Sequence, residues 1–125
     1  MQFDIAGTLL VLGRILLGGL FVFGGIKHFF ILPILTEIVS KRGVPCARLA
    51  LIAASTFQAV VGALLVFGIY VVPAVIGLIG FTLIASVVML NYWDMQGEAR
   101  EAAKNNWAVN FGVIGGLILA AAQAL

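Results

Sequence analysis

Four long apolar segments divide this 125-residue chain, and they constrain its fold more than any other feature of the sequence. They cover about residues 5–26, 49–69, 71–90 and 107–125, and the second and third contain no charged residue. An α-helix rises about 1.5 Å per residue, so about 20 residues cross the roughly 30 Å hydrocarbon core of a bilayer. The segments therefore predict four transmembrane helices.

The composition is typical of a membrane protein. Apolar residues make up 63% of the chain and charged residues 10%, and the mean hydropathy is +1.21. Soluble domains are usually nearer half apolar and a quarter charged, and a small fold leaves too much surface exposed to hide such an excess. Disordered chains are polar and poor in aliphatic residues. We expect an all-α, integral membrane four-helix bundle that forms a single transmembrane domain over residues 1–125.

The longest link, residues 27–48, carries its own helical pattern. Apolar side chains recur at helical spacing between Pro33 and Gly43, and polar side chains lie on the opposite face. Proline favours the first turn of a helix and glycine its end. This pattern predicts a short amphipathic helix over about residues 33–42 that lies in the membrane interface.

The other two links differ sharply from each other. Residues 68–73 leave room only for a tight turn between the second and third spans, with Pro73 in the first turn of the next helix. Residues 91–106 are polar, and their middle, residues 97–104, predicts a short surface helix because it has little apolar surface to bury.

Lysine and arginine are concentrated in the two long links. The net charge is +2, but no block of like charge indicates a nucleic-acid partner. Cytoplasmic links of membrane proteins carry an excess of basic residues, so we expect both long links in the cytoplasm and both termini outside it. The six basic residues in these links are Lys27, Lys41, Arg42, Arg48, Arg100 and Lys104.

Arg14 is the one charge inside a predicted span. Nine residues beyond Ile5, it lies about 14 Å along the helix, near the bilayer midplane. An arginine there costs about 2.5–3.5 kcal/mol on insertion scales and usually faces a partner inside the bundle. Gln58 is predicted at a similar depth and offers a carbonyl oxygen to the guanidinium. Two interpretations remain open, a neutral network that fixes helix register and a site that binds a ligand.

Polar and aromatic residues mark the ends of the third and fourth spans. Tyr92 and Trp93 form an amphipathic pair of the kind found at headgroup level. Alternatively, Trp93 stacks on a lipid-soluble ring and Asn91 donates a hydrogen bond to it. Asn110, near the same end of the fourth span, could meet Asn91 across the two helices.

Small residues recur every four positions along the fourth span. Such a stripe lets helix backbones approach closely, which is a main packing device inside a membrane. Ser55, Ala59 and Ala63 form a similar stripe of small residues in the second span. The glycine pairs 18–19 and 24–25 permit close approach of another helix to the first span. The stripe in the fourth span consists of Ala108, Gly112, Gly116, Ala120 and Ala124.

One cysteine and one histidine limit the redox and metal chemistry of the chain. Cys46 has no partner for an intramolecular disulfide, and His28 cannot supply both axial ligands of a bis-histidine haem. We expect His28 to be solvated or to cap its helix, and Cys46 to be an inert small residue. No metal site, no catalytic residue and no intrinsic cofactor are expected.

Several short motifs, taken in order, resemble the DoxX family of small four-helix membrane proteins. Gly13-Arg14 is followed by Gly18, Phe21, Gly25 and Lys27, and later landmarks are Gly43-Val44-Pro45, Tyr92-Trp93 and the stretch from Asn110 to Gly116. Two positions depart from the family pattern, because the family often has glutamate at the position of Gln58 and lysine at that of Val109. The resemblance implies a membrane component of a redox system, as in the branch tied to thiosulfate:quinone oxidoreductase. It carries over no catalytic residue.

The leading hypothesis is a membrane subunit of a respiratory or redox complex linked to quinone, located in a bacterial inner membrane. The chain is expected to be a non-catalytic subunit rather than an enzyme by itself, in contact with membrane lipid and with other membrane subunits or copies of itself. The first alternative is a purely structural or assembly subunit, and the second is a small-solute permease. Candidate residues for an intramembrane quinone or lipid site are Arg14, Gln58, Asn91, Trp93 and Asn110.

Overall fold

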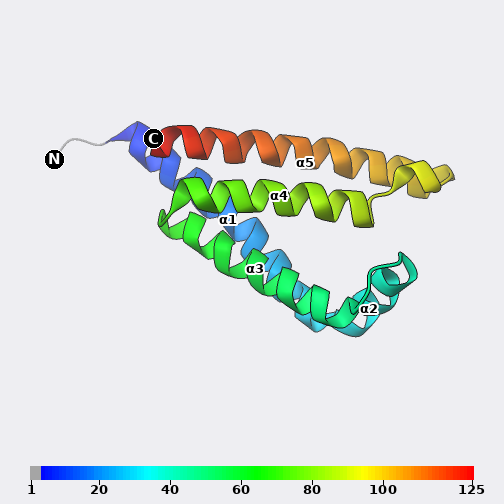
Figure 1. Ribbon diagram of the computed structural model, residues 1–125. Helices are drawn as coiled ribbons and strands as arrows, with labels where there is room; N and C mark the ends of the chain where they lie inside the picture. Colours follow the sequence, from blue (N-terminus) through cyan, green and yellow to red (C-terminus); the bar gives the residue numbers. More distant parts are fainter. Residues whose placement is uncertain (1–3) are drawn as a thin grey trace.

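The computed structural model describes residues 4–125, and these residues form helices joined by short links (Figure 1). Four of the helices are long and apolar enough to cross a membrane. The predicted all-α membrane bundle with four spans is therefore confirmed. In chain order the elements are α1 (Ile5–Phe30), α2 (Leu32–Lys41), α3 (Ala47–Phe67), α4 (Val71–Met89), the 3-10 turn η1 (Tyr92–Asp94) and α5 (Gly97–Ala124).

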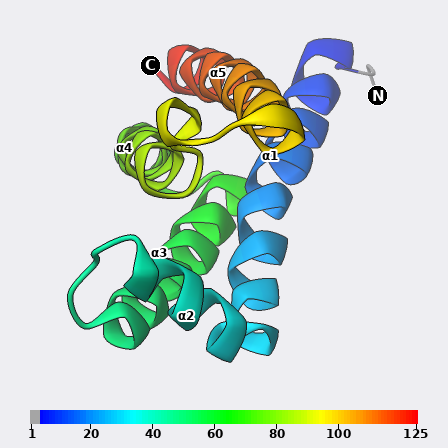
Figure 2. The same ribbon diagram turned by 90° about the vertical axis from the view of Figure 1, so that its right-hand side faces the viewer.

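The spans are arranged as two antiparallel pairs. Helix α1 lies along α3, and α4 lies along α5, with the α3–α4 turn joining the pairs at one end (Figure 1). Towards the other end the pairs diverge, and α2 lies beside α3 at this open end (Figure 2). The fully buried side chains of Leu65, Leu78 and Leu117 form the centre of the core where α3, α4 and α5 meet.

Helices α1 and α3 are packed backbone against backbone. A Cβ atom added to Gly18 would lie 2.6 Å from the carbonyl oxygen of Gly62, and one added to Gly25 would lie 2.7 Å from that of Ser55. Only glycine allows such an approach, as expected for small residues at membrane helix interfaces. Gly19, in contrast, has no neighbouring atom within 4 Å of the same position. The interface holds the end of α1 in helical form as far as Phe30, beyond the predicted end near residue 26.

The predicted short elements are present. Helix α2 (Leu32–Lys41) has Pro33 in its first turn, and Gly43 follows it with a φ of 87°. The tight turn between α3 and α4 uses the left-handed conformation at Gly68 and Tyr70, with φ values of 73° and 50°. Gly68 adopts this conformation without the steric cost that a side chain brings.

The predicted separate surface helix over residues 97–104 is wrong. These residues are the start of α5, which continues without a break from Gly97 to Ala124. At about 1.5 Å per residue its 28 residues span about 42 Å, more than the bilayer core needs, so the charged first third extends beyond the end of α4. The physical reason is that residues 98–111 contain neither glycine nor proline, and a polar helix that continues an apolar one needs no nucleus of its own.

Candidate functional site

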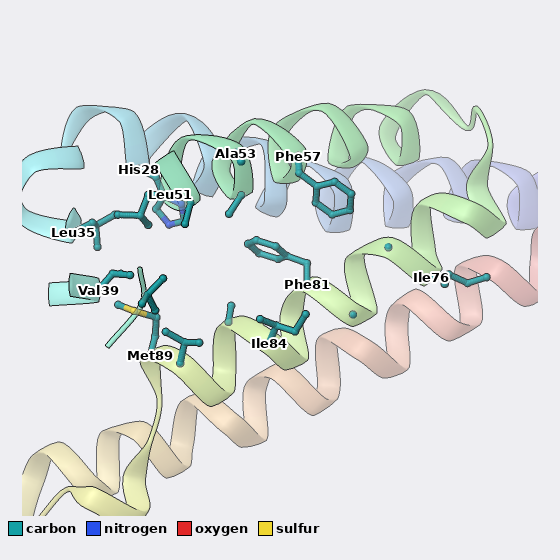
Figure 3. A pocket seen from close by; sticks show the side chains of 17 residues that line it. His28, Leu35, Val39, Leu51, Ala53, Phe57, Ile76, Phe81, Ile84 and Met89 are labelled. Carbon is teal, nitrogen blue, oxygen red and sulfur yellow. The ribbon is translucent and has the colours of Figure 1, made fainter. Parts of the chain in front are cut away.

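The divergence of the helix pairs leaves an apolar groove between α3 and α4, hereafter the α3–α4 groove (Figure 3). Its volume is about 710 Å³, and Leu35, Val39 and Val44 close its end beside α2. Small residues give the groove its depth. Those on α3 are Ala50, Ala53 and Ala54, and those on α4 are Gly77, Gly80 and Ala85.

Two phenylalanine rings lie side by side in the α3–α4 groove. Phe57 from α3 and Phe81 from α4 both project into the space between the two helices (Figure 3), with ring centroids 6.1 Å apart and planes inclined by 33°. Gly77 makes room for the first ring, because a Cβ there would lie 2.9 Å from its Cζ atom. Gly80 has no atom within 4 Å of that position, so it borders open space in the groove.

His28 supplies the only side-chain nitrogen or oxygen among the described residues that line the α3–α4 groove. Its Nδ1 atom lies 3.1 Å from the hydroxyl of Ser55, a side chain that is buried in the α1–α3 interface. The expectation of a solvated or capping histidine is therefore wrong. Because α1 continues to Phe30, His28 belongs to the last turn of this helix, and its ring packs against α3. In the tautomer whose proton is on Nε2, Ser55 donates to Nδ1, and Nε2 can donate to a ligand.

The end of the groove near α2 is held by Arg42. Its guanidinium donates to the carbonyl oxygen of Val88 at 3.1 Å and to the side-chain oxygen of Asn91. These bonds tie the chain just after α2 to the end of α4. Asn91 is therefore engaged by an arginine, which was not predicted, and it is not bonded to Asn110.

Asn110 instead joins α5 to α4. Its side-chain amide donates to the hydroxyl of Ser86 at 2.8 Å, and the indole of Trp107 donates to the carbonyl oxygen of Leu90 at 2.6 Å. The Ser86 hydroxyl in turn donates to the carbonyl oxygen of Thr82 at 2.6 Å. This polar contact is inside the α4–α5 pair and not on the wall of the α3–α4 groove.

Trp93 belongs to an aromatic cluster at the end of α4. It is half exposed, and its ring lies edge-on to that of Tyr92, with centroids 5.4 Å apart. Tyr92 also contacts Trp107 and lies within 6 Å of the charged ends of Arg100 and Lys104. Cations beside amphipathic rings match the interfacial anchor that the sequence predicts.

Arg14 and Gln58 do not meet. Gln58 is buried against Gly24, and its side-chain oxygen has no hydrogen-bond partner among the described residues. The guanidinium of Arg14 covers Gly68 in the α3–α4 turn, where an added Cβ would lie 3.0 Å from Cζ. Gly68 is ten residues beyond Gln58, which is about 15 Å along α3. The depth of Arg14 was counted from the start of α1, and that of Gln58 from the start of α3 at the opposite end of the bundle. The count placed Arg14 too deep, because α1 begins beyond the level of the α3–α4 turn.

The five candidate ligand residues thus form no single site, because Arg14 and Gln58 lie apart from each other and from the three residues near the end of α4. None of the five lines the α3–α4 groove. Their role in ligand binding stays a prediction. Sequence reasoning missed the groove, although a signal was present. Residues 50, 53, 54 and 57 of α3, and residues 77, 80, 81, 84, 85 and 88 of α4, recur at helical spacing and combine small side chains with single large ones.

The small-residue stripe of α5 faces two ways. Gly116 packs against Leu17 of α1, and Ala120 is buried in the core, whereas Ala108 and Gly112 are exposed. A helix turns about 100° per residue, so positions four apart rotate by about 40° and the stripe winds around the helix. Gly116 and Ala120 therefore pack within the bundle, whereas Ala108, Gly112 and Ala124 are exposed.

Comparison with known proteins identifies the family of the chain. A family model described as DoxX matches residues 9–91. The chain belongs to the DoxX family. All described residues that line the α3–α4 groove fall within the matched DoxX segment, and α5 lies outside it. The resemblance predicted from the sequence motifs is confirmed.

The chain is also similar to the inner membrane protein YphA of Escherichia coli (strain K12). The two are 27% identical over 114 residues, which cover 91% of this chain and 81% of that protein. No solved structure matches the chain. Together with the four spans, the DoxX match shows an integral membrane protein.

Proposed function

We propose that this protein is a non-catalytic membrane subunit of a quinone-linked redox complex and that a quinone head group binds in the α3–α4 groove. The observation that supports this is an apolar groove of about 710 Å³ with one hydrogen-bonding side chain. Binding sites for small ligands are usually apolar clefts of about 300–1,000 Å³ with a few polar groups that fix orientation.

The chemistry of the lining favours a flat ring with a carbonyl group. Phe57 from α3 and Phe81 from α4 pack against each other, and a flat ring in the groove can pack against this aromatic pair. His28 can donate a hydrogen bond from Nε2 to a quinone carbonyl while Ser55 holds the ring through Nδ1. An acyl chain would fill the same volume but would leave the Nε2 atom of His28 without a partner, which costs free energy in an apolar setting.

The proposed role in the redox reaction is binding and orientation. His28 would hold one carbonyl of the quinone, and the apolar walls would exclude water from it. The electrons would come from a partner subunit, so the groove would lie near the electron donor in the assembled complex.

Quinone affinity after His28→Phe tests the proposal. The variant keeps an aromatic ring and removes the donor, so the loss of one hydrogen bond is expected to weaken affinity about threefold to tenfold. The measurement is a titration of protein in lipid nanodiscs with a soluble quinone analogue. Tyr70→Phe is the control, because it removes a polar group from an exposed ring at the opposite end of the bundle. Equal affinity in His28→Phe and the unmodified protein would contradict the role of His28.

An assembly subunit is the second candidate, and one observation favours it. Gly112 and Gly115 are exposed on α5, and a Cβ on either would have no atom within 4 Å. Exposed small residues allow another membrane helix to approach closely. Under this alternative, Gly112→Leu releases the partner subunits from the gently purified complex while His28→Phe leaves quinone affinity unchanged.

We also propose a bacterial inner membrane location, as in the relative from Escherichia coli, with both termini outside the cytoplasm. The support for this orientation is the six lysine and arginine residues in the two long links. A fluorescent protein fused to the C-terminus is expected to stay dark, because it does not fold after export in unfolded form. Bright fluorescence from membrane-inserted fusion protein would reverse the orientation.

A further inference from the structure

We propose that a second groove, between α1 and α5, binds an anionic phospholipid whose phosphate pairs with Arg14. This α1–α5 groove has a volume of about 550 Å³ and is separate from the α3–α4 groove. Its walls are mainly leucine and small residues, including Leu17, Leu20 and Gly116. Among the described residues of its lining, Arg14 is the one charged side chain, and Gln123 adds a polar group near the end of α5.

The first step of the argument is the unpaired charge. The Nε atom of Arg14 is buried and has no hydrogen-bond partner among the described residues. The chain's carboxylate side chains lie elsewhere. Asp4 caps the start of α1 and Glu37 pairs with Lys41, while Asp94, Glu98 and Glu101 follow the end of α4. No carboxylate side chain lies beside the guanidinium to pair with its charge, so an external anion can take that place.

The second step is the depth of the charge. The guanidinium lies over Gly68 in the α3–α4 turn rather than at the middle of a span. The non-helical backbone of such a turn cannot be exposed in the hydrocarbon core, so the turn lies at the membrane edge. Phospholipid phosphates lie at this level, and their acyl chains extend inward along the direction of the apolar groove walls.

The third step is the match of shapes. A guanidinium presents parallel N–H donors that fit two phosphate oxygens, which makes arginine well suited to a phosphodiester. The leucine walls would contact the acyl chain, and Gly13 leaves the mouth of the groove open because a Cβ there has no atom within 4 Å. An anion without acyl chains would contact the guanidinium but not the leucine walls, so the expected ligand is a lipid and not free phosphate.

The test measures the lipid bound to delipidated protein by native mass spectrometry. Phosphatidylglycerol is expected to bind about tenfold more tightly than phosphatidylcholine, and Arg14→Gln is expected to remove this preference. Arg48→Gln is the matched control, because Arg48 is an exposed arginine at the start of α3 outside the groove. Inorganic phosphate alone is expected to give no thermal stabilisation at concentrations where phosphatidylglycerol does.

A second variant keeps the proposal testable if Arg14→Gln fails to fold. Gly13→Leu fills the mouth of the groove without changing charge and should lower phosphatidylglycerol affinity, whereas Gly19→Leu on the same helix should not. Two lipid-binding results would each overturn the proposal: no preference for phosphatidylglycerol in the unmodified protein, or an unchanged preference in Arg14→Gln. Stabilisation by phosphate alone would also overturn it, and so would a lipid-free dimer that Gly13→Leu dissociates.

Quinone affinity should be unchanged in Arg14→Gln, which separates this site from the α3–α4 groove.

Discussion

Gly18→Leu is expected to lower the free energy of unfolding by about 3 kcal/mol. A Cβ at this position would lie 2.6 Å from the backbone oxygen of Gly62 and 2.7 Å from a methyl group of Val66. A backbone atom cannot rotate away, so α1 and α3 would have to separate along their shared interface. The measurement is an unfolding experiment in mild detergent. Loss of the α1–α3 contact in this experiment is detected by disulfide cross-linking between the two helices.

Gly19→Leu is the matched control for this prediction. It makes the same change on the neighbouring residue of α1, where a Cβ has no atom within 4 Å. Surface substitutions of this kind usually change stability by less than about 0.5 kcal/mol. If Gly18→Leu and Gly19→Leu unfold at the same temperature, the backbone contact between α1 and α3 is not part of the native structure.

Gly80→Phe is expected to reduce quinone affinity nearly a hundredfold. Gly80 lines the α3–α4 groove, and a Cβ there would have no atom within 4 Å, so a phenylalanine at this position would extend into the volume of the ligand. Loss of roughly 100 Å² of apolar ring contact, at about 25 cal/mol per Å², removes about 2.5 kcal/mol of binding free energy. The measurement is the nanodisc titration with the quinone analogue.

Gly115→Phe is the control for a blocked groove. This residue is exposed on α5, outside the α3–α4 groove, and also has no atom within 4 Å of an added Cβ. The same change in size should leave quinone affinity as it is. Undiminished quinone binding by Gly80→Phe, in protein that unfolds at the normal temperature, would exclude the groove as the binding site.

Those features of the fold that depend on local pattern could be predicted from the sequence. Segment length predicted the four spans, helical spacing between Pro33 and Gly43 predicted α2, and the short interval from Gly68 to Pro73 predicted the tight turn. The continuity of α5 was missed because its charged start resembles a separate surface helix. Hydropathy reports what a segment contacts, and a single helix can pass from water into lipid without a break.

The candidate site depended on information that the local pattern does not contain. The contact between His28 and Ser55 requires the register of α1 against α3, which the glycines at positions 18 and 25 set through three-dimensional packing. For the same reason, counting residues inward from each helix end placed Arg14 beside Gln58 when the structure keeps them apart. The small residues of α3 and α4 resembled packing surfaces in the sequence, and only the divergence of the helix pairs turns them into a groove.

The position of a photoreactive quinone on the protein tests the central proposal most directly. After illumination in nanodiscs and proteolysis, the label is expected on peptides of α3 and α4 that contain Phe57 and Phe81, and excess unlabelled quinone should remove it. Label on the outward face of α5, or spread evenly over the lipid-exposed residues of all four spans, would contradict quinone binding in the α3–α4 groove.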